Sequence, residues 1–144
     1  MESDYSRAIE MITRGSEAFI QLYYKSLDEN RSIIASFYEP ASPIVYNGNP
    51  ISGGEMLAQM YANMPVTTHE VGSFDCHPLA AGVNGQPSIA LTVSGKVRIG
   101  ADKAKRMCGY SESFILKPQM DGKFYISTSC YRLVHRPDDV DIEP

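Results

Sequence analysis

The segment Ser88 to Ile99 reads SIALTVSGKVRI, and Arg106 to Pro118 follows it with RMCGYSESFILKP. In both segments bulky apolar residues alternate with small or hydroxylated ones, which is the side-chain period of a β-strand. Two neighbouring segments, Thr68 to Leu79 and Lys123 to Leu133, repeat the alternation. Because short turn-forming stretches separate the four segments, the sequence predicts an antiparallel sheet of long strands.

Period-two alternation gives this sheet two unlike faces. The first face collects bulky residues: Phe74, Cys76, Ile89, Leu91, Val93, Val97, Phe114, Leu116, Phe124, Ile126 and Cys130. The second face collects mostly small or hydroxylated ones: Ser73, Asp75, Thr92, Ser94, Ser111, Ser113, Ile115, Tyr125, Ser127, Ser129 and Tyr131. The same alternation places Glu112 on the first face and both His69 and His77 on the second.

The second face is nearly free of charge, apart from Asp75, Lys96 and Arg98. A sheet face that simply meets water usually carries Lys and Glu, whereas protein interfaces lack charge at their centre and are enriched in Tyr. Two interpretations stay open, a docking surface for another protein and a solvated face rich in Ser and Thr. The pattern favours docking.

Length and charge limit the other possibilities. A chain of 144 residues has room for one core, so we expect a single domain over residues 1–136. The net charge is −4, but four of the 17 acidic residues lie in 137–144, which we expect to be a disordered acidic tail. The rest carries 13 acidic and 13 basic residues, and this balance argues against tight binding of the isolated chain to nucleic acid.

Cysteine usage indicates neither a disulfide framework nor a metal site. Cys76, Cys108 and Cys130 form an odd set without a C-x-x-C motif, which is typical of a reducing intracellular compartment. We therefore predict no metal and no cofactor. The longest uncharged run, residues 76–95, is broken by Pro, Gly and Asn, so no membrane span or membrane partner is expected.

The first half of the chain reads as helical. Apolar residues recur at helical spacing over residues 4–27, and a short second helix is expected over 30–37. Asn47-Gly48 predicts a type I′ hairpin within residues 44–52, and Ser52 with Glu55 matches a capping box that opens a third helix. Helices followed by antiparallel strands indicate an α+β domain of two layers. The sheet face without helices must then meet water or a partner.

This order of elements, with its local strings, resembles the nuclear transport factor 2-like superfamily, and within it the small subunits of the general messenger-RNA export receptor. The strings occur in order over about residues 19–131: Phe19-Ile20-x-x-Tyr23-Tyr24-x-x-Leu27-Asp28, Phe37-Tyr38, Val45-Tyr46-Asn47-Gly48-Asn49, Ile51-Ser52-Gly53, Asp75-Cys76-His77-Pro78 and Ser113-Phe114-Ile115-Leu116. The resemblance implies a cone-shaped fold, in which three helices pack in the concave face of a strongly bent antiparallel sheet.

The resemblance also implies a function. Such proteins are non-catalytic subunits of a heterodimer, whose uncovered sheet face binds the corresponding domain of the large receptor subunit. The pair binds Phe-Gly repeats of nucleoporins, carries mRNA through the nuclear pore and shuttles between nucleus and cytoplasm. In the family the acid of the Asp-Cys-x-Pro string pairs with an arginine of the large subunit, and that role falls on Asp75. An ordinary surface charge is the alternative.

The sequence departs from the family at Glu112, where many relatives carry Gln, and at Tyr46, where a relative has Trp. Glu112 therefore leaves open the alternative of a small isomerase or dehydratase-like enzyme, because the same fold hosts such enzymes with polar residues in the cone. Tyr23, Tyr24 or Tyr61 would be its hydroxyl donors. A third reading is a homodimeric transport factor for a small GTPase. Ordinary core packing, which fills the cone, is the favoured reading of the large apolar side chains Phe19, Phe37, Phe114, Phe124, Met60 and Met64.

Basic residues gather at the turn between the second and third long strands. Lys103, Lys105 and Arg106 lie at its tip, and Lys96 and Arg98 lie nearby. The ordinary interpretation is a solvated charged turn. The functional one is a phosphate contact, which would bind RNA only weakly or only within an assembled receptor.

Overall fold

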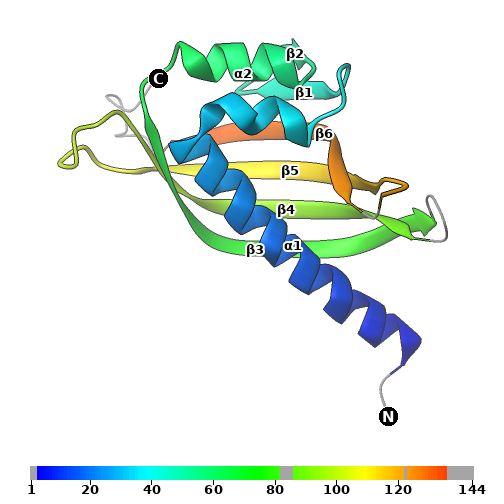
Figure 1. Ribbon diagram of the computed structural model, residues 1–144. Coiled ribbons are helices and arrows are strands. Elements are labelled where there is room, and N and C mark those ends of the chain that lie inside the picture. Colours follow the sequence, from blue (N-terminus) through cyan, green and yellow to red (C-terminus); the bar gives the residue numbers. More distant parts are fainter. Residues whose placement is uncertain (1–2, 82–85, 122, 136–144) are drawn as a thin grey trace.

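Six strands form one sheet in the order β2-β1-β6-β5-β4-β3 (Figure 1). The computed structural model describes residues 3–81, 86–121 and 123–135. Along the chain the elements are α1 (Asp4–Glu29), η1 (Arg31–Phe37), β1 (Pro43–Tyr46), β2 (Asn49–Ser52), α2 (Gly54–Ala62), β3 (Thr67–Ala81), β4 (Pro87–Ile99), β5 (Cys108–Pro118) and β6 (Phe124–Val134). Neighbouring strands are antiparallel except β1 and β6, which run parallel.

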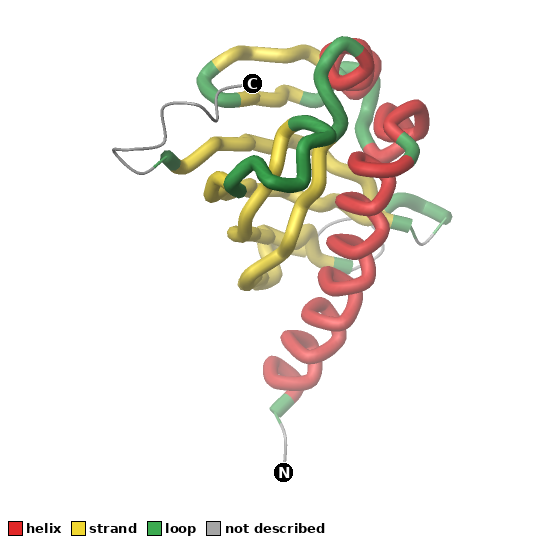
Figure 2. Tube along the Cα trace, turned by 90° about the vertical axis from the view of Figure 1, so that its left-hand side faces the viewer, coloured by secondary structure: helices red, strands yellow, loops and turns green. Residues whose placement is uncertain are grey.

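The helices lie on one side of the sheet and leave the other side uncovered (Figure 2). This arrangement confirms the predicted α+β class and the three helices packed in a bent sheet. The predicted tail over residues 137–144 lies outside the described residues. No helix in the described part of the chain is long and apolar enough to cross a membrane.

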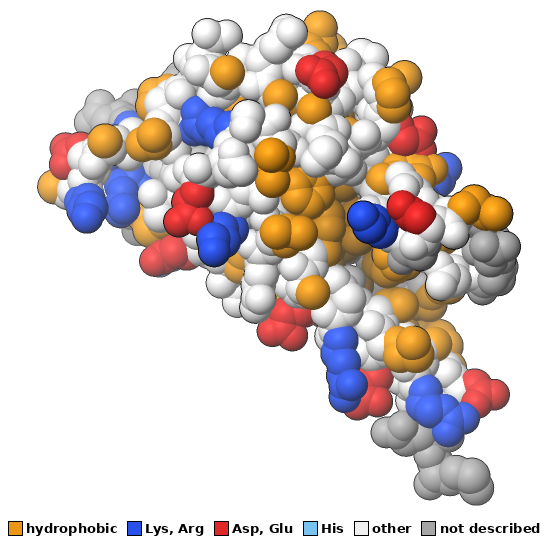
Figure 3. Space-filling model, viewed as in Figure 1, with side chains coloured by type: hydrophobic (Ala, Val, Ile, Leu, Met, Phe, Trp, Pro, Cys, Tyr) orange, Lys and Arg blue, Asp and Glu red, His pale blue; other side chains and the backbone are white. Residues whose placement is uncertain are grey.

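The long helix α1 begins with a side-chain cap, because the Ser3 hydroxyl accepts a hydrogen bond from the Ser6 amide. Its C-terminal half buries Ile20, Tyr23 and Leu27 against the sheet. The N-terminal turns project beyond the sheet and carry charges of both signs, including an ion pair between Arg7 and Asp4 (Figure 3). Most of the core contribution of α1 therefore comes from its second half, with Ile12 packed against the core from the first.

The hairpin of β1 and β2 turns at Asn47 and Gly48, whose φ angles are 50° and 87°. Both values are positive, as the predicted type I′ turn requires. The predicted capping box is wrong. Ser52 pairs with Pro43 inside the sheet, so its hydroxyl lies outside the helix end, and Gly53 occupies the N-cap without a side-chain hydrogen bond.

Aromatic rings fill the space between the helices and the sheet. The Tyr23 ring packs edge-on against Phe37 and Phe114, with ring centroids 5.4 Å apart in each pair. A second group stacks across neighbouring strands: Tyr46 lies 5.2 Å from Tyr131, which lies 5.5 Å from Tyr110. The expected ordinary core is thus present around these rings.

Candidate partner-binding face

Three consecutive rows of side chains cross the middle of the uncovered side of the sheet, and we call these three rows the open face. Strand register defines them from β3 to β6: His77, Ala90, Ile115 and Thr128; Asp75, Thr92, Ser113 and Cys130; Ser73, Ser94, Ser111 and Arg132. The middle row continues onto β1, where Val45 pairs with Cys130. All of these side chains are exposed or half-buried.

Small side chains make the open face flat and poor in charge. The Ser73 and Ser94 hydroxyls lie 2.9 Å apart and satisfy each other across the strands. Within the rows the carboxylate of Asp75 lies on β3 and the guanidinium of Arg132 on β6. A partner covering the centre would therefore desolvate few charges, which is the usual composition of an interface core.

Most of the residues predicted for the interface lie on the uncovered side of the sheet. Ser73, Asp75, Thr92, Ser94, Ser111, Ser113 and Ile115 all lie in the rows. Tyr125 pairs with Lys117 just beyond them, and its side chain lies near Glu39. Ser127 is half-buried and has no partner residue on β5.

The predictions for Ser129 and Tyr131 are wrong, because a β-bulge at Ser127 shifts the alternation along β6. Ile115 pairs with Thr128 and Leu116 with Ile126, which leaves Ser127 as the extra residue. Ser129 and Tyr131 consequently point toward the helices, and both are buried.

The same shift turns Cys130 outward, although it was expected in the core. Phe124 is 38% exposed at the end of β6 instead of buried. Thr128, Cys130 and Arg132 are the open-face residues that the alternation missed.

A second bulge, at Gly72, overturns the prediction for His69. Val71 pairs with Gly95 and Ser73 with Ser94, so Gly72 is the extra residue in β3. His69 therefore points inward, where its side chain is 1% exposed. Its Nδ1 lies 2.7 Å from Oδ1 of Asp28, and its Nε2 lies 3.0 Å from the Tyr131 hydroxyl. His77, beyond the bulge, is exposed on the open face as predicted.

Asp75 presents an exposed carboxylate on β3. Within the part of the chain that the structure describes, the ion pairs do not include it. The neighbouring Thr92 hydroxyl reaches only the backbone carbonyl of Asp75, at 3.5 Å. The carboxylate is therefore accessible to a cation from another molecule.

Glu112 lies on the helix side of the sheet, as the alternation predicted, and is 4% exposed. The Tyr24 hydroxyl donates a 2.8 Å hydrogen bond to its carboxyl group. Burial raises the pKa of Glu112 to about 8, although the Tyr24 hydrogen bond opposes the shift. The carboxyl group is thus mostly protonated at neutral pH.

Glu112 lies among buried tyrosines of the core. Tyr23 and Tyr38 share a 2.6 Å hydrogen bond beside it, and burial raises the pKa of both hydroxyls. Neither the large groove beside α1 nor the two smaller hollows is lined by Glu112. A general base needs hydrogen-bond reach to its substrate, and Glu112 is enclosed by core side chains.

The basic turn lies between β4 and β5 at the margin of the sheet. Lys103 and Arg106 are exposed there, and the Lys105 ammonium donates a 3.0 Å hydrogen bond to the Ile99 carbonyl. Lys105 thus helps to close the turn. Among the described residues no cluster of three His, Cys, Asp or Glu side chains could hold a metal ion.

A bent sheet wrapped around three helices, with its other side uncovered, defines the nuclear transport factor 2-like class. Solved structures support the fold. Nuclear transport factor 2 from Cryptosporidium parvum superposes with a TM-score of 0.70 at 23% identity, over 93% of this chain and 98% of that one. The complex of Candida albicans Mtr2 with the Mex67 M domain gives 0.68 at 22% identity, over 88% and 98%.

Sequence comparison defines the family. The model of the Mtr2 family, described as nuclear pore RNA shuttling protein, matches residues 10–123. The NTF2-related export protein of Caenorhabditis elegans is 30% identical over 127 residues, which cover 87% of this chain and 90% of the relative. The chain belongs to the Mtr2 family. The resemblance to small subunits of the mRNA export receptor is confirmed, and these relatives bear the names of transport factors.

Proposed function

We propose that the chain is the non-catalytic small subunit of a heterodimeric nuclear mRNA export receptor, with the open face as its binding surface for the large subunit. The observation that carries the proposal is the middle row, in which the uncharged residues Thr92, Ser113 and Cys130 continue from the exposed carboxylate of Asp75. The Candida albicans complex supports a partner of the Mex67 type. An arginine of that partner, placed opposite Asp75, would donate a charge-assisted hydrogen bond to its carboxylate.

The assembled heterodimer then binds Phe-Gly repeats of nucleoporins and carries mRNA through the nuclear pore, shuttling between nucleus and cytoplasm. The nuclear pore and RNA in the description of the family model support this part of the proposal. The balanced charge of residues 1–136 fits a subunit that contributes little RNA affinity of its own.

Co-expression with a Mex67-type large subunit followed by sizing chromatography tests the pairing. Asp75→Arg and Ser113→Arg each place a bulky cation in the middle row, so we expect both to abolish the heterodimer and leave the circular dichroism spectrum unchanged. Glu55→Arg is the matched control, because Glu55 is exposed on α2, on the other side of the sheet. Normal heterodimer formation by both open-face variants would refute the proposal. A stable homodimer of the wild-type chain would favour the alternative, a homodimeric transport factor for a small GTPase.

A further inference from the structure

A groove of about 1000 Å³ runs between the C-terminal half of α1 and the edge strand β3. Its apolar walls include Ile20, Val66, Val71 and Phe74. Val66 and Val71 are 52% and 41% exposed, so the groove offers apolar surface to a ligand. The groove lies on the helix side of the sheet and meets the open face only at Ser73.

One side of the groove is an unpaired strand edge, since β3 ends the strand order. The Val66 carbonyl accepts a 2.7 Å hydrogen bond from the Gly100 amide of the neighbouring strand. Antiparallel pairs alternate, so His69 and Val71 direct their amide and carbonyl groups away from β4. The His69 amide is already taken by Oδ2 of Asp28, at 2.7 Å. The free edge available for pairing therefore begins after His69, at Val71.

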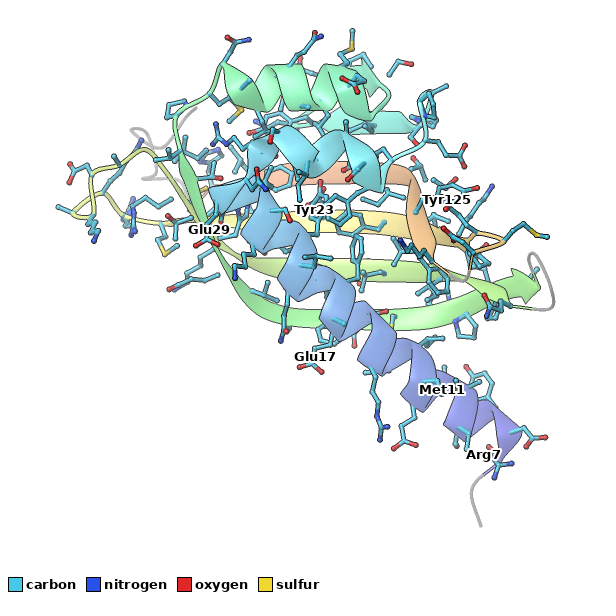
Figure 4. All side chains as sticks on the ribbon, viewed as in Figure 1. Arg7, Met11, Glu17, Tyr23, Glu29 and Tyr125 are labelled. Carbon is cyan, nitrogen blue, oxygen red and sulfur yellow. The ribbon has the colours of Figure 1, made fainter. Side chains whose placement is uncertain are left out.

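The other side of the groove is a stripe of charged residues along α1. Glu17 and Glu29 project from the helix away from the buried Tyr23 (Figure 4). Among the described residues the ion pairs include neither of them, and Lys25 is the cation that lines the groove with them. Asp28 adds a third carboxylate, already bonded to His69. This excess of carboxylates attracts a cationic ligand and repels phosphate.

We propose that this groove binds an extended basic peptide of a partner protein, which adds to β3 as a further strand. Alternate side chains of such a strand point to one face. Arg or Lys on the face toward α1 would pack their aliphatic stems on Val71 and Phe74 and place their charges near Glu17 and Glu29. The unpaired edge supplies backbone hydrogen bonds to the peptide, and the carboxylates favour a peptide with positive charge. The site lies on the helix side of the sheet and shares Ser73 with the open face.

The probe is a fluorescein-labelled peptide of alternating Arg and Val, six residues long, added to the full chain in complex with its large subunit. Fluorescence anisotropy measures its affinity. We expect the double variant Glu17→Arg/Glu29→Arg to weaken binding about tenfold, since two ion pairs become repulsive. The matched control Glu55→Arg leaves the affinity unchanged. Equal binding to the double variant, or equal binding of a Glu-Val peptide, overturns the proposal.

Strand addition has a separate readout. Methylating the peptide amides along one edge removes the donors that would pair with β3, so one of the two alternate N-methylated peptides should lose binding. Amide hydrogen exchange at Val71 should slow when the unmodified peptide is bound. Binding by both methylated peptides, with unchanged exchange at Val71, would exclude a paired strand. Binding of an RNA oligonucleotide in the groove would also contradict the proposal.

Discussion

The Tyr24 hydroxyl donates a hydrogen bond to the Glu112 carboxyl group inside the core and thereby joins α1 to β5. The carboxyl group is buried among tyrosine rings, and its pKa of about 8 lies well above the ordinary value of 4.5. Folding therefore favours the protonated acid, so this group makes the stability of the domain depend on pH.

Glu112→Gln should remove that dependence. Between pH 4.5 and about 8 the folded state holds a proton that the unfolded state has lost. Stability consequently falls as pH rises, by up to about 1.4 kcal/mol per unit from this group. Below pH 4.5 its contribution is fully present. We expect denaturant unfolding at a series of pH values to show a flatter profile for the variant, and greater stability than wild type at pH 8.

Glu70→Gln is the control for this experiment, because Glu70 is exposed on β3. Its profile should keep the wild-type slope. A Glu112→Gln profile that keeps the wild-type slope would contradict the assignment of the proton to Glu112.

Asp28→Asn should loosen the contact between α1 and β3. The carboxylate accepts three hydrogen bonds, from the Thr67 hydroxyl, the His69 amide and the His69 ring, each 2.7 Å long. An amide group cannot accept all three, so we expect a loss of about 1–3 kcal/mol in the free energy of unfolding. Asp4→Asn, in an exposed ion pair, should change it by less than about 1 kcal/mol. Equal effects of the two substitutions would refute the anchoring role.

Two glycines should respond oppositely to substitution by alanine. A Cβ on Gly15, inside α1, meets no atom within 4 Å, so Gly15→Ala should stabilise the domain by about 1 kcal/mol. A Cβ on Gly95 would lie 2.1 Å from the Glu70 carbonyl oxygen, which is backbone and cannot turn aside. Gly95→Ala should therefore lower the melting temperature markedly. Thermal unfolding of both variants checks the signs, and a neutral Gly95→Ala would contradict the close approach at the bulge.

Cys130 should be the fastest-reacting thiol of the chain. It is exposed in the middle row, whereas Cys108 is buried and Cys76 is half-buried. We expect maleimide labelling, followed by mass spectrometry, to modify Cys130 first in the isolated chain and slowly in the heterodimer. Cys130→Ala should abolish the fast phase. If the fast phase persists, the register of β6 is wrong; if the heterodimer reacts as fast as the free chain, the open face is not the interface.

Charge reversal at Lys103, Lys105 and Arg106 should lower the RNA affinity of the heterodimer and leave its assembly intact. The reason is that the turn lies at the margin of the sheet, away from the middle row. A salt titration of RNA binding measures the effect, and the variant should show a shallower dependence on salt concentration. Identical titrations of variant and wild type would remove the turn from RNA binding.

The sequence was sufficient to predict the helices, the long strands, and the face of the sheet to which the side chains in the middle of β4 and β5 point. Alternation places Thr92, Ser113 and Glu112 on the correct faces because β4 and β5 are regular there. It fails in β3 and β6, since one inserted residue reverses every side chain up to the end of the strand. Gly72 inside a strand pattern was a readable sign of such an insertion. The Ser127-Thr128-Ser129 run gave no sign, because its three residues suit either face equally well.

The bulge at Gly72 has a consequence for how this chain can vary in evolution. Deleting that single residue would rotate the start of β3 by half a turn, expose the His69 imidazole and leave Asp28 without its ring partner. Turns such as 100–107 should tolerate changes in length, whereas the number of residues between His69 and Asp75 should stay constant wherever this helix anchor and this docking row occur together.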